Sequence, residues 1–162
     1  MVDISQVTEH VYVGSRIGST HADELKFMKF DLIISMMGEM RPDTIYSLPP
    51  FSSLWIPSYD TFFTPIPIKM LMTGIDAALP VIRAGGKVLI FCMQGRRRSI
   101  IMAAAILISE GHPADEAVEL LIKARKVADP RRWYVRSQIW GFERYWKLMH
   151  ADVPPVPGRT HP

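Results

Sequence analysis

The segment from Lys87 to Ile108 constrains the fold more than any other part of the chain. It begins with the strand-like run KVLIF, continues through the polar turn CMQGRRRS, and ends in the apolar stretch IIMAAAILI. A continuous apolar run of this kind is typical of a strand buried on both faces of a sheet, and the longer run is typical of a buried helix. The segment therefore predicts a buried strand, a short turn and a helix in sequence.

Strand-like and helix-like runs alternate along the rest of the chain. We expect strands at 10–14, 31–37, 53–56 and 87–91. We expect a first helix that starts after Thr20, a second over 68–83 and a third that starts near Arg98 or Ser99. Two more helices should cover 114–128 and 134–150. Pro57 should stop the third strand, and Pro80 should kink the second helix or end it early. This alternation predicts a single α/β domain with a mostly parallel central sheet and helices on both faces.

Composition narrows the class of protein. Of 162 residues, 48% are hydrophobic and 22% are charged, which excludes a disordered or collagen-like chain. We assign 1–150 to the domain and expect the Pro-rich tail 151–162 to be disordered. The longest apolar run, Ile100 to Ile108, is far short of the roughly 20 residues that span a bilayer. We expect no membrane span and, from the N-terminal residues, no secretory signal.

The chain has one cysteine, Cys92, so no disulfide can form within it, and we expect a cytoplasmic protein in a reducing compartment. The net charge of +3 is compatible with an anionic ligand, and we expect no nucleic-acid partner. The five histidines are scattered, without the spacing of metal ligands. We therefore expect neither a metal nor a cofactor.

Residues 92–99, which we call the Cys92 loop, combine the features of an oxyanion site. The N–H groups of the turn and of the first helical residues can converge on one point, where the helix dipole adds positive potential. Gly95 allows a backbone conformation that a Cβ would forbid. Arg98 can fork onto two oxygens of a phosphate. The expected substrate-binding groups are those of Met93, Gln94, Gly95, Arg96, Arg97 and Arg98.

Cys92 faces the same positive field, which favours the thiolate, the nucleophilic form of cysteine. Ser99 can donate a hydrogen bond to the Cys92 sulfur in a step in which that sulfur is the leaving group. The spacing of Cys92 and Arg98 alone is weak evidence, and the alternative is an inert buried cysteine beside a solvated basic turn. The preceding strand, Gly95, Ser99 and the apolar helix favour the chemical interpretation.

The sequence CMQGRRRS resembles the signature His-Cys-x-x-Gly-x-x-Arg-Ser/Thr of the cysteine-dependent protein tyrosine phosphatases. Up to about His150 the chain resembles their compact dual-specificity branch: HVYVGS is similar to its opening strand, and ARKVADPRRWYVRSQIWGFERYW to its closing helices. In that family the cysteine attacks phosphorus, the arginine binds the phosphoryl oxygens, and an aspartate on another loop protonates the leaving group. The resemblance implies these roles for Cys92, Arg98 and Asp60.

Asp60 lies 32 residues before Cys92 and follows a short strand, as the family's general acid does. Phe91 departs from the family, because it stands where a histidine is usual. Gln94 occupies a position where a small residue is common, so it should narrow the pocket or add a hydrogen bond. Arg96 and Arg97 are unusually basic. They either recognise extra anionic groups, as basic residues do in family members that act on phosphoinositides, or lie solvated.

We thus expect a phosphatase that hydrolyses phosphotyrosine and phosphoserine/threonine through a cysteinyl-phosphate intermediate. Its partner would be a phosphorylated protein or a small anionic phosphoester, and its oligomeric state stays open. One alternative is a phosphatase for non-protein anionic substrates such as phosphoinositides. Others are a catalytically weak phosphate-binding module and a sulfurtransferase or arsenate reductase. Arsenate reduction is disfavoured, because it usually needs further thiols.

Overall fold

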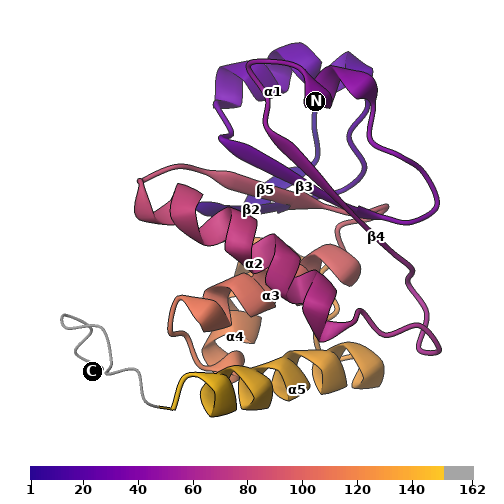
Figure 1. Ribbon diagram of the computed structural model, residues 1–162. Helices are drawn as coiled ribbons and strands as arrows, with labels where there is room; N and C mark the ends of the chain where they lie inside the picture. The colour runs from indigo at the N-terminus through magenta and orange to yellow at the C-terminus, as the bar shows by residue number, and fades with distance from the viewer. Residues whose placement is uncertain (152–162) are drawn as a thin grey trace.

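Five strands form one sheet in the computed structural model, which describes residues 1–151 (Figure 1). In spatial order β1-β2-β5-β3-β4, they are Ile4–Gln6, Val11–Gly14, Val88–Phe91, Leu32–Met37 and Ser53–Ser58. β1 is antiparallel to β2, and the remaining neighbours are parallel. The buried strand expected before the Cys92 loop is β5, at the centre of the sheet. The prediction of a mostly parallel α/β fold is confirmed.

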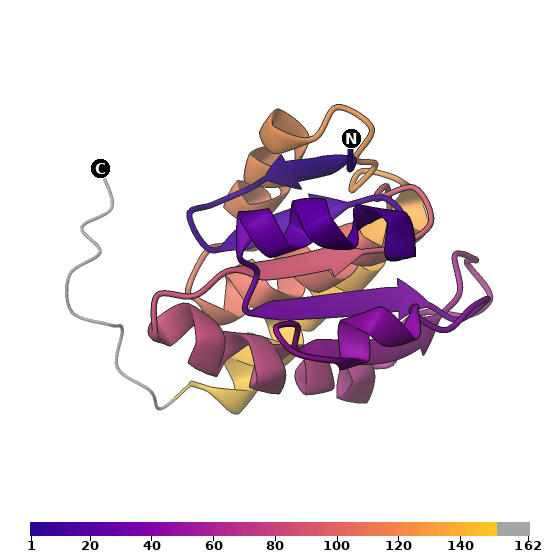
Figure 2. The same cartoon turned by 90° about the horizontal axis from the view of Figure 1, so that it is seen from above.

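Helices cover both faces of the sheet (Figures 1 and 2). α1 (Ala22–Met28) lies on one face, and the other carries α2 (Ile68–Arg83), α3 (Arg98–Ser109), α4 (Ala114–Ala124) and α5 (Trp133–Met149). Short 3-10 turns occupy Ser19–His21 and Thr44–Ser47. The side chains of α3 are buried all round the helix from Arg98 to Ile108, which explains its continuous apolar sequence.

Several predicted boundaries are wrong, and β1 escaped prediction. The first helix does not start directly after Thr20, because a 3-10 turn over Ser19–His21 comes before α1. Pro57 lies inside β4, where it is tolerated because β4 is an edge strand. Pro80 lies inside α2, which continues to Arg83 with Ala78 and Ile82 buried on either side of the proline.

The fourth helix, α4, ends at Ala124, earlier than expected, because Arg125 adopts an extended backbone conformation. This early end directs Arg125 toward the Cys92 loop, as described below. No helix within residues 1–151 is long and apolar enough to cross a membrane. The predicted disordered tail lies outside the described residues from position 152 onward.

Candidate active site

The Cys92 loop connects the centre of the sheet to a helix N-terminus. β5 ends at Phe91, and α3 begins at Arg98. Cys92 is only 3% exposed, and its N–H donates to the carbonyl of Gly14 at 3.4 Å. Its Sγ lies 3.3 Å from the Ser99 Oγ. The structure thus places the thiol at the carboxyl edge of the parallel strands, where α/β folds bind their ligands.

The backbone of the loop has free donors. No atom in residues 1–151 accepts a hydrogen bond from the N–H groups between Met93 and Arg97. Gly95 has a φ of +60°, and a Cβ there would lie 2.6 Å from the backbone of Gly14 and 2.7 Å from Arg125 Nη2. Only glycine fits this turn. The N–H groups are therefore free to donate to a bound oxyanion, and their role in substrate binding stays a prediction.

Arg125 supports the loop from behind, and sequence reasoning missed it. It is 3% exposed, and it donates from Nε to the Gly95 carbonyl at 2.7 Å and from Nη2 to the Gln94 carbonyl at 3.0 Å. Asp3 accepts from Nη1 and Nη2 at 3.0 and 2.6 Å. These hydrogen bonds hold the pKa of Asp3 below its usual value. A buried arginine just after a helix carries no local sequence signal for this role.

Phe91, the departure from the family signature, is buried on the α1 side of the sheet. It packs in a cluster with Tyr12 and Leu89. A phenyl ring offers no hydrogen bond to the loop. Other residues donate to the carbonyls of the loop instead. The side chain of Arg125 donates to the Gly95 carbonyl. The Arg16 N–H donates to the Met93 carbonyl at 3.2 Å, and the Asp129 N–H donates to the Arg96 carbonyl at 2.9 Å.

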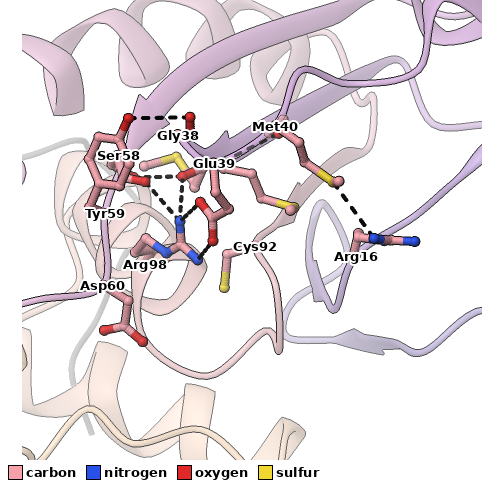
Figure 3. A network of polar contacts seen from close by, with 12 residues as sticks. Arg16, Gly38, Glu39, Met40, Ser58, Tyr59, Asp60, Cys92 and Arg98 are labelled. Carbon is pink, nitrogen blue, oxygen red and sulfur yellow. Dashed lines mark hydrogen bonds and ion pairs between the residues drawn. The ribbon is translucent and has the colours of Figure 1, made fainter.

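Arg98 is held as a rigid fork (Figure 3). Its Nη1 and Nη2 donate to the two carboxylate oxygens of Glu39 at 2.6 and 2.7 Å, and Nη1 also donates to the Ser58 carbonyl at 2.8 Å. The residue is 4% exposed. Its Nε is buried and has no hydrogen-bond partner among the described residues. A buried N–H that lacks an acceptor is costly, so this atom calls for a ligand oxygen.

Electrostatics keep the Arg98 pair ionised. Burial disfavours the arginine's charge, but the hydrogen bonds to Glu39 and the nearby negative groups outweigh it and raise the pKa of Arg98. The same hydrogen bonds lower the pKa of Glu39. Glu39, just after β3, was not foreseen, because a single glutamate in a loop gives no indication of a partner 59 residues away.

Asp60 lies on the loop between β4 and α2, next to the Cys92 loop. Its Oδ2 accepts from Arg97 Nη1 at 3.2 Å, and its Oδ1 accepts from the Tyr134 hydroxyl at 3.0 Å. The structure therefore brings Asp60 to the predicted site through Arg97. Two other aspartates are poorer candidates for the acid: Asp43 accepts a hydrogen bond from the N–H of Ser19, and Asp76 lies within α2.

The two extra arginines pair with carboxylates of the protein. Arg97 contacts Asp60 and also donates from Nε to Asp129 Oδ2 at 3.4 Å. Arg96 lies 3.6 Å from the same Asp129 oxygen and is more exposed. Arg97 is therefore neither simply solvated nor free to bind a distant anion. The side chains of Met93 and Gln94 are exposed at the rim of the loop.

No model of a known protein family matches the chain. Two curated proteins are similar in sequence. The protein-tyrosine-phosphatase MKP1 of Arabidopsis thaliana is 29% identical over 132 residues, which cover 79% of this chain and 16% of that protein. Dual specificity phosphatase 28 of Mus musculus is 32% identical over 87 residues, which cover 51% of this chain and 50% of that protein. The chain thus spans half or less of each curated relative.

Solved structures share the whole fold. A mouse putative dual specificity phosphatase, complexed with zinc tungstate, superposes with a TM-score of 0.79 at 22% identity, covering 92% of this chain and 91% of that one. PTPMT1 in complex with PI(5)P gives a TM-score of 0.79 at 19% identity, covering 90% and 97%. The chain is thus similar in sequence to two phosphatases and shares the fold of the dual-specificity phosphatases.

Proposed function

We propose that the chain hydrolyses phosphomonoesters through a covalent phosphate on Cys92. The observation that carries this proposal is the buried, unpartnered Nε of Arg98, in a guanidinium that lies beside Cys92 (Figure 3). The free N–H groups of the Cys92 loop are on the same edge of the sheet. A phosphoryl group supplies acceptors for both sets of donors. The tungstate complexed with the mouse neighbour, also an oxyanion, supports the same interpretation.

In the first step, the Cys92 thiolate attacks phosphorus in line with the departing ester oxygen. The loop N–H groups and Arg98 hold the three equatorial oxygens, whose charge must be stabilised in the transition state. Asp60, in its protonated form, transfers its proton to the ester oxygen as the P–O bond breaks. The products of this step are a free alcohol or phenol, a cysteinyl-phosphate and the Asp60 carboxylate.

In the second step, water cleaves the intermediate. The Asp60 carboxylate accepts a proton from the water, whose oxygen bonds to phosphorus while the S–P bond breaks. Inorganic phosphate leaves, and the electrons of the S–P bond return to sulfur. The Ser99 hydroxyl, 3.3 Å from the sulfur, donates a hydrogen bond to the thiolate as it forms. Asp60 ends the cycle protonated.

The substrate class we propose is phosphotyrosine together with phosphoserine/threonine on proteins. Tyr59 and Phe62, on the same loop as Asp60, are exposed and give the site an apolar rim. Both curated relatives are named as phosphatases, one of them dual-specific. We also propose a cytoplasmic location, because a reducing compartment keeps the nucleophilic thiol from oxidation.

A second candidate is a phosphatase for small, multiply charged phosphoesters. A surface cavity of about 480 Å³ adjoins the Cys92 loop. It is lined by Arg96 and Lys126 and also by the carboxylates of Asp3 and Asp129. The two cations could bind a second anionic group, and the neighbour PTPMT1 was solved with PI(5)P. Replacing both Arg96 and Lys126 by alanine should then reduce activity on inositol phosphates more than on a small aryl phosphate.

One substrate panel tests these alternatives. The purified protein and Cys92→Ser are assayed side by side on phosphotyrosyl, phosphoseryl and phosphothreonyl peptides and on inositol phosphates. Hydrolysis of the peptides by the wild type alone supports the main proposal, and preference for inositol phosphates supports the second. Phosphate binding without turnover of any ester would identify a binding module instead.

A further inference from the structure

Three separate parts of the chain meet at the carboxylate of Asp60. The residue itself belongs to the loop after β4, Arg97 belongs to the Cys92 loop, and Tyr134 lies in the first turn of α5. Arg97 Nη1 and the Tyr134 hydroxyl donate to different oxygens of the carboxylate, at 3.2 and 3.0 Å. Both oxygens of the acid are therefore fixed by named donors.

Arg97 has a firm base from which to hold Asp60. It directly precedes α3, and its carbonyl accepts from the Ile101 N–H at 2.8 Å. Its side chain is 18% exposed, and its Nε donates to Asp129. Asp129 is itself bonded to the Cys92 loop, through its N–H to the Arg96 carbonyl at 2.9 Å. The guanidinium keeps this second carboxylate partner when Asp60 carries a proton.

The loop that carries Asp60 has few other anchors. Phe62 and Phe63 are at least half exposed, and the Thr61 and Thr64 side chains bond to each other. The loop has two other contacts with α5. The Ile66 N–H donates to Gln138 at 2.8 Å, and the Phe62 ring centroid lies 5.7 Å from that of Trp133. Arg97 and Tyr134 are the residues whose hydrogen bonds fix the Asp60 carboxylate itself.

We propose that Arg97 is a positioning residue for the general acid, holding the Asp60 carboxylate at the edge of the Cys92 loop while Tyr134 sets its orientation. The inference rests on the proposed function, with Asp60 as the acid. Arg97 acts through Asp60 rather than on the phosphoryl group. As the proton passes to the ester oxygen, negative charge develops on Asp60, and a charge-assisted hydrogen bond from Arg97 strengthens at that moment.

The test compares Arg97→Gln with Arg96→Gln, which removes the same charge from a neighbouring arginine that does not contact Asp60. Each is assayed on an ester with a poorly acidic leaving group and on an aryl phosphate whose phenol leaves readily as an anion. General acid catalysis contributes about 10²–10⁴-fold, and a misplaced acid loses part of that. We expect Arg97→Gln to lose about 10-fold or more in kcat/KM on the first ester and little in kcat/KM on the second, because kcat/KM reports the step in which the leaving group departs. Any loss in Arg96→Gln should be equal for both.

A double-variant cycle gives a second readout. In an Asp60→Asn background, Arg97→Gln should cause no further leaving-group-dependent loss, because the acid that it positions is gone. Arg97→Lys should recover part of the loss, since an ammonium can reach one Asp60 oxygen. Equal losses on both esters, or losses that add to those of Asp60→Asn, would overturn the inference. If Cys92→Ser keeps wild-type turnover, the proposed function itself fails, which is a distinguishable result.

Discussion

The Nε of Arg125 donates to the carbonyl of Gly95 at 2.7 Å, across 30 residues of chain. This hydrogen bond connects the end of α4 to the turn that carries the oxyanion donors. Asp3, near the N-terminus, completes the contact by accepting from both terminal nitrogens of the arginine. The shape of the Cys92 loop therefore depends on residues near the N-terminus and at the end of α4.

Removing Asp3 should destabilise the domain. Asp3→Ala leaves the buried Arg125 charge without its carboxylate, and hydrogen bonds to charged groups contribute about 1.5–3 kcal/mol. Because the Asp3 side chain is 61% exposed and solvent screens the pair, we expect the free energy of unfolding to fall by about 1 kcal/mol, measured by urea denaturation. Asp3→Asn keeps an acceptor and should lose less. A change below about 0.5 kcal/mol in Asp3→Ala would contradict the contact.

The same pair predicts a dependence of stability on pH. The hydrogen bonds from Arg125 lower the pKa of Asp3 in the folded state. The stabilisation is therefore present above the unfolded pKa and is lost as pH falls through the folded pKa. Unfolding midpoints measured between neutral and strongly acid pH should fall less steeply for Asp3→Asn than for the wild type. Parallel curves would show that Asp3 does not contribute.

Gly95 and Gly85 provide a matched pair of substitutions. Both have positive φ, +60° and +82°, but a Cβ at Gly85 meets no atom within 4 Å, whereas one at Gly95 meets the Gly14 backbone at 2.6 Å. Gly85→Ala should cost only the strain of a left-handed alanine, about 1–2 kcal/mol of stability, with normal turnover. Gly95→Ala should cost more stability and also most of the activity. Equal effects of the two would show that the loop tolerates a shift.

Arg98→Lys should be severely impaired although the charge is kept. A lysine cannot bind both oxygens of Glu39, the Ser58 carbonyl and a phosphate at once. Glu39→Gln should also reduce kcat/KM, because it leaves the buried guanidinium less firmly held. Steady-state assays on one aryl phosphate measure both variants. Wild-type rates in Arg98→Lys would show that Arg98 does not bind the phosphoryl group.

Asp60→Asn should slow hydrolysis most for esters whose leaving group needs a proton. With an activated aryl phosphate, phenol release should be less affected, because an acidic phenol leaves as its anion without a proton from Asp60. Alkylation of Cys92 should change little, since Asp60 is outside the Cys92 loop. A small, uniform loss across leaving groups would assign the acid to another residue.

The sequence identified the parts of the site that are contiguous in the chain. A run of apolar residues, a glycine and an apolar helix are local signals, so the buried strand β5, the Cys92 loop and the start of α3 could be predicted together. The predicted strand and helix boundaries at Pro57 and Pro80 were wrong, because whether a proline ends an element depends on the element's position and packing. Proline lacks a backbone N–H. An edge strand such as β4 tolerates this loss, and a well-packed helix such as α2 continues beyond the proline.

The contacts that support the site could not be predicted in the same way. Glu39 meets Arg98 across 59 residues, and Asp3 meets Arg125 across 122. Such pairs form only when the strand order of the sheet brings the segments together. The sequence left two alternatives for Arg97, binding of an extra anionic group or solvation, and both assumed a side chain without a partner in the protein. The carboxylates of Asp60 and Asp129 bind it instead.

The central claim is that Cys92 carries the phosphate during turnover, and trapping the intermediate tests it most directly. Radiolabelled phosphoester is mixed with the wild type, with Asp60→Asn and with Cys92→Ser, the reactions are stopped by rapid denaturation, and labelled peptides are identified. We predict label on the Cys92 peptide of the wild type and more of it in Asp60→Asn with an activated ester, because the base for hydrolysis is lost. Cys92→Ser should bind phosphate but show neither label nor turnover. Turnover by the wild type without label on Cys92, or turnover by Cys92→Ser, would contradict the account.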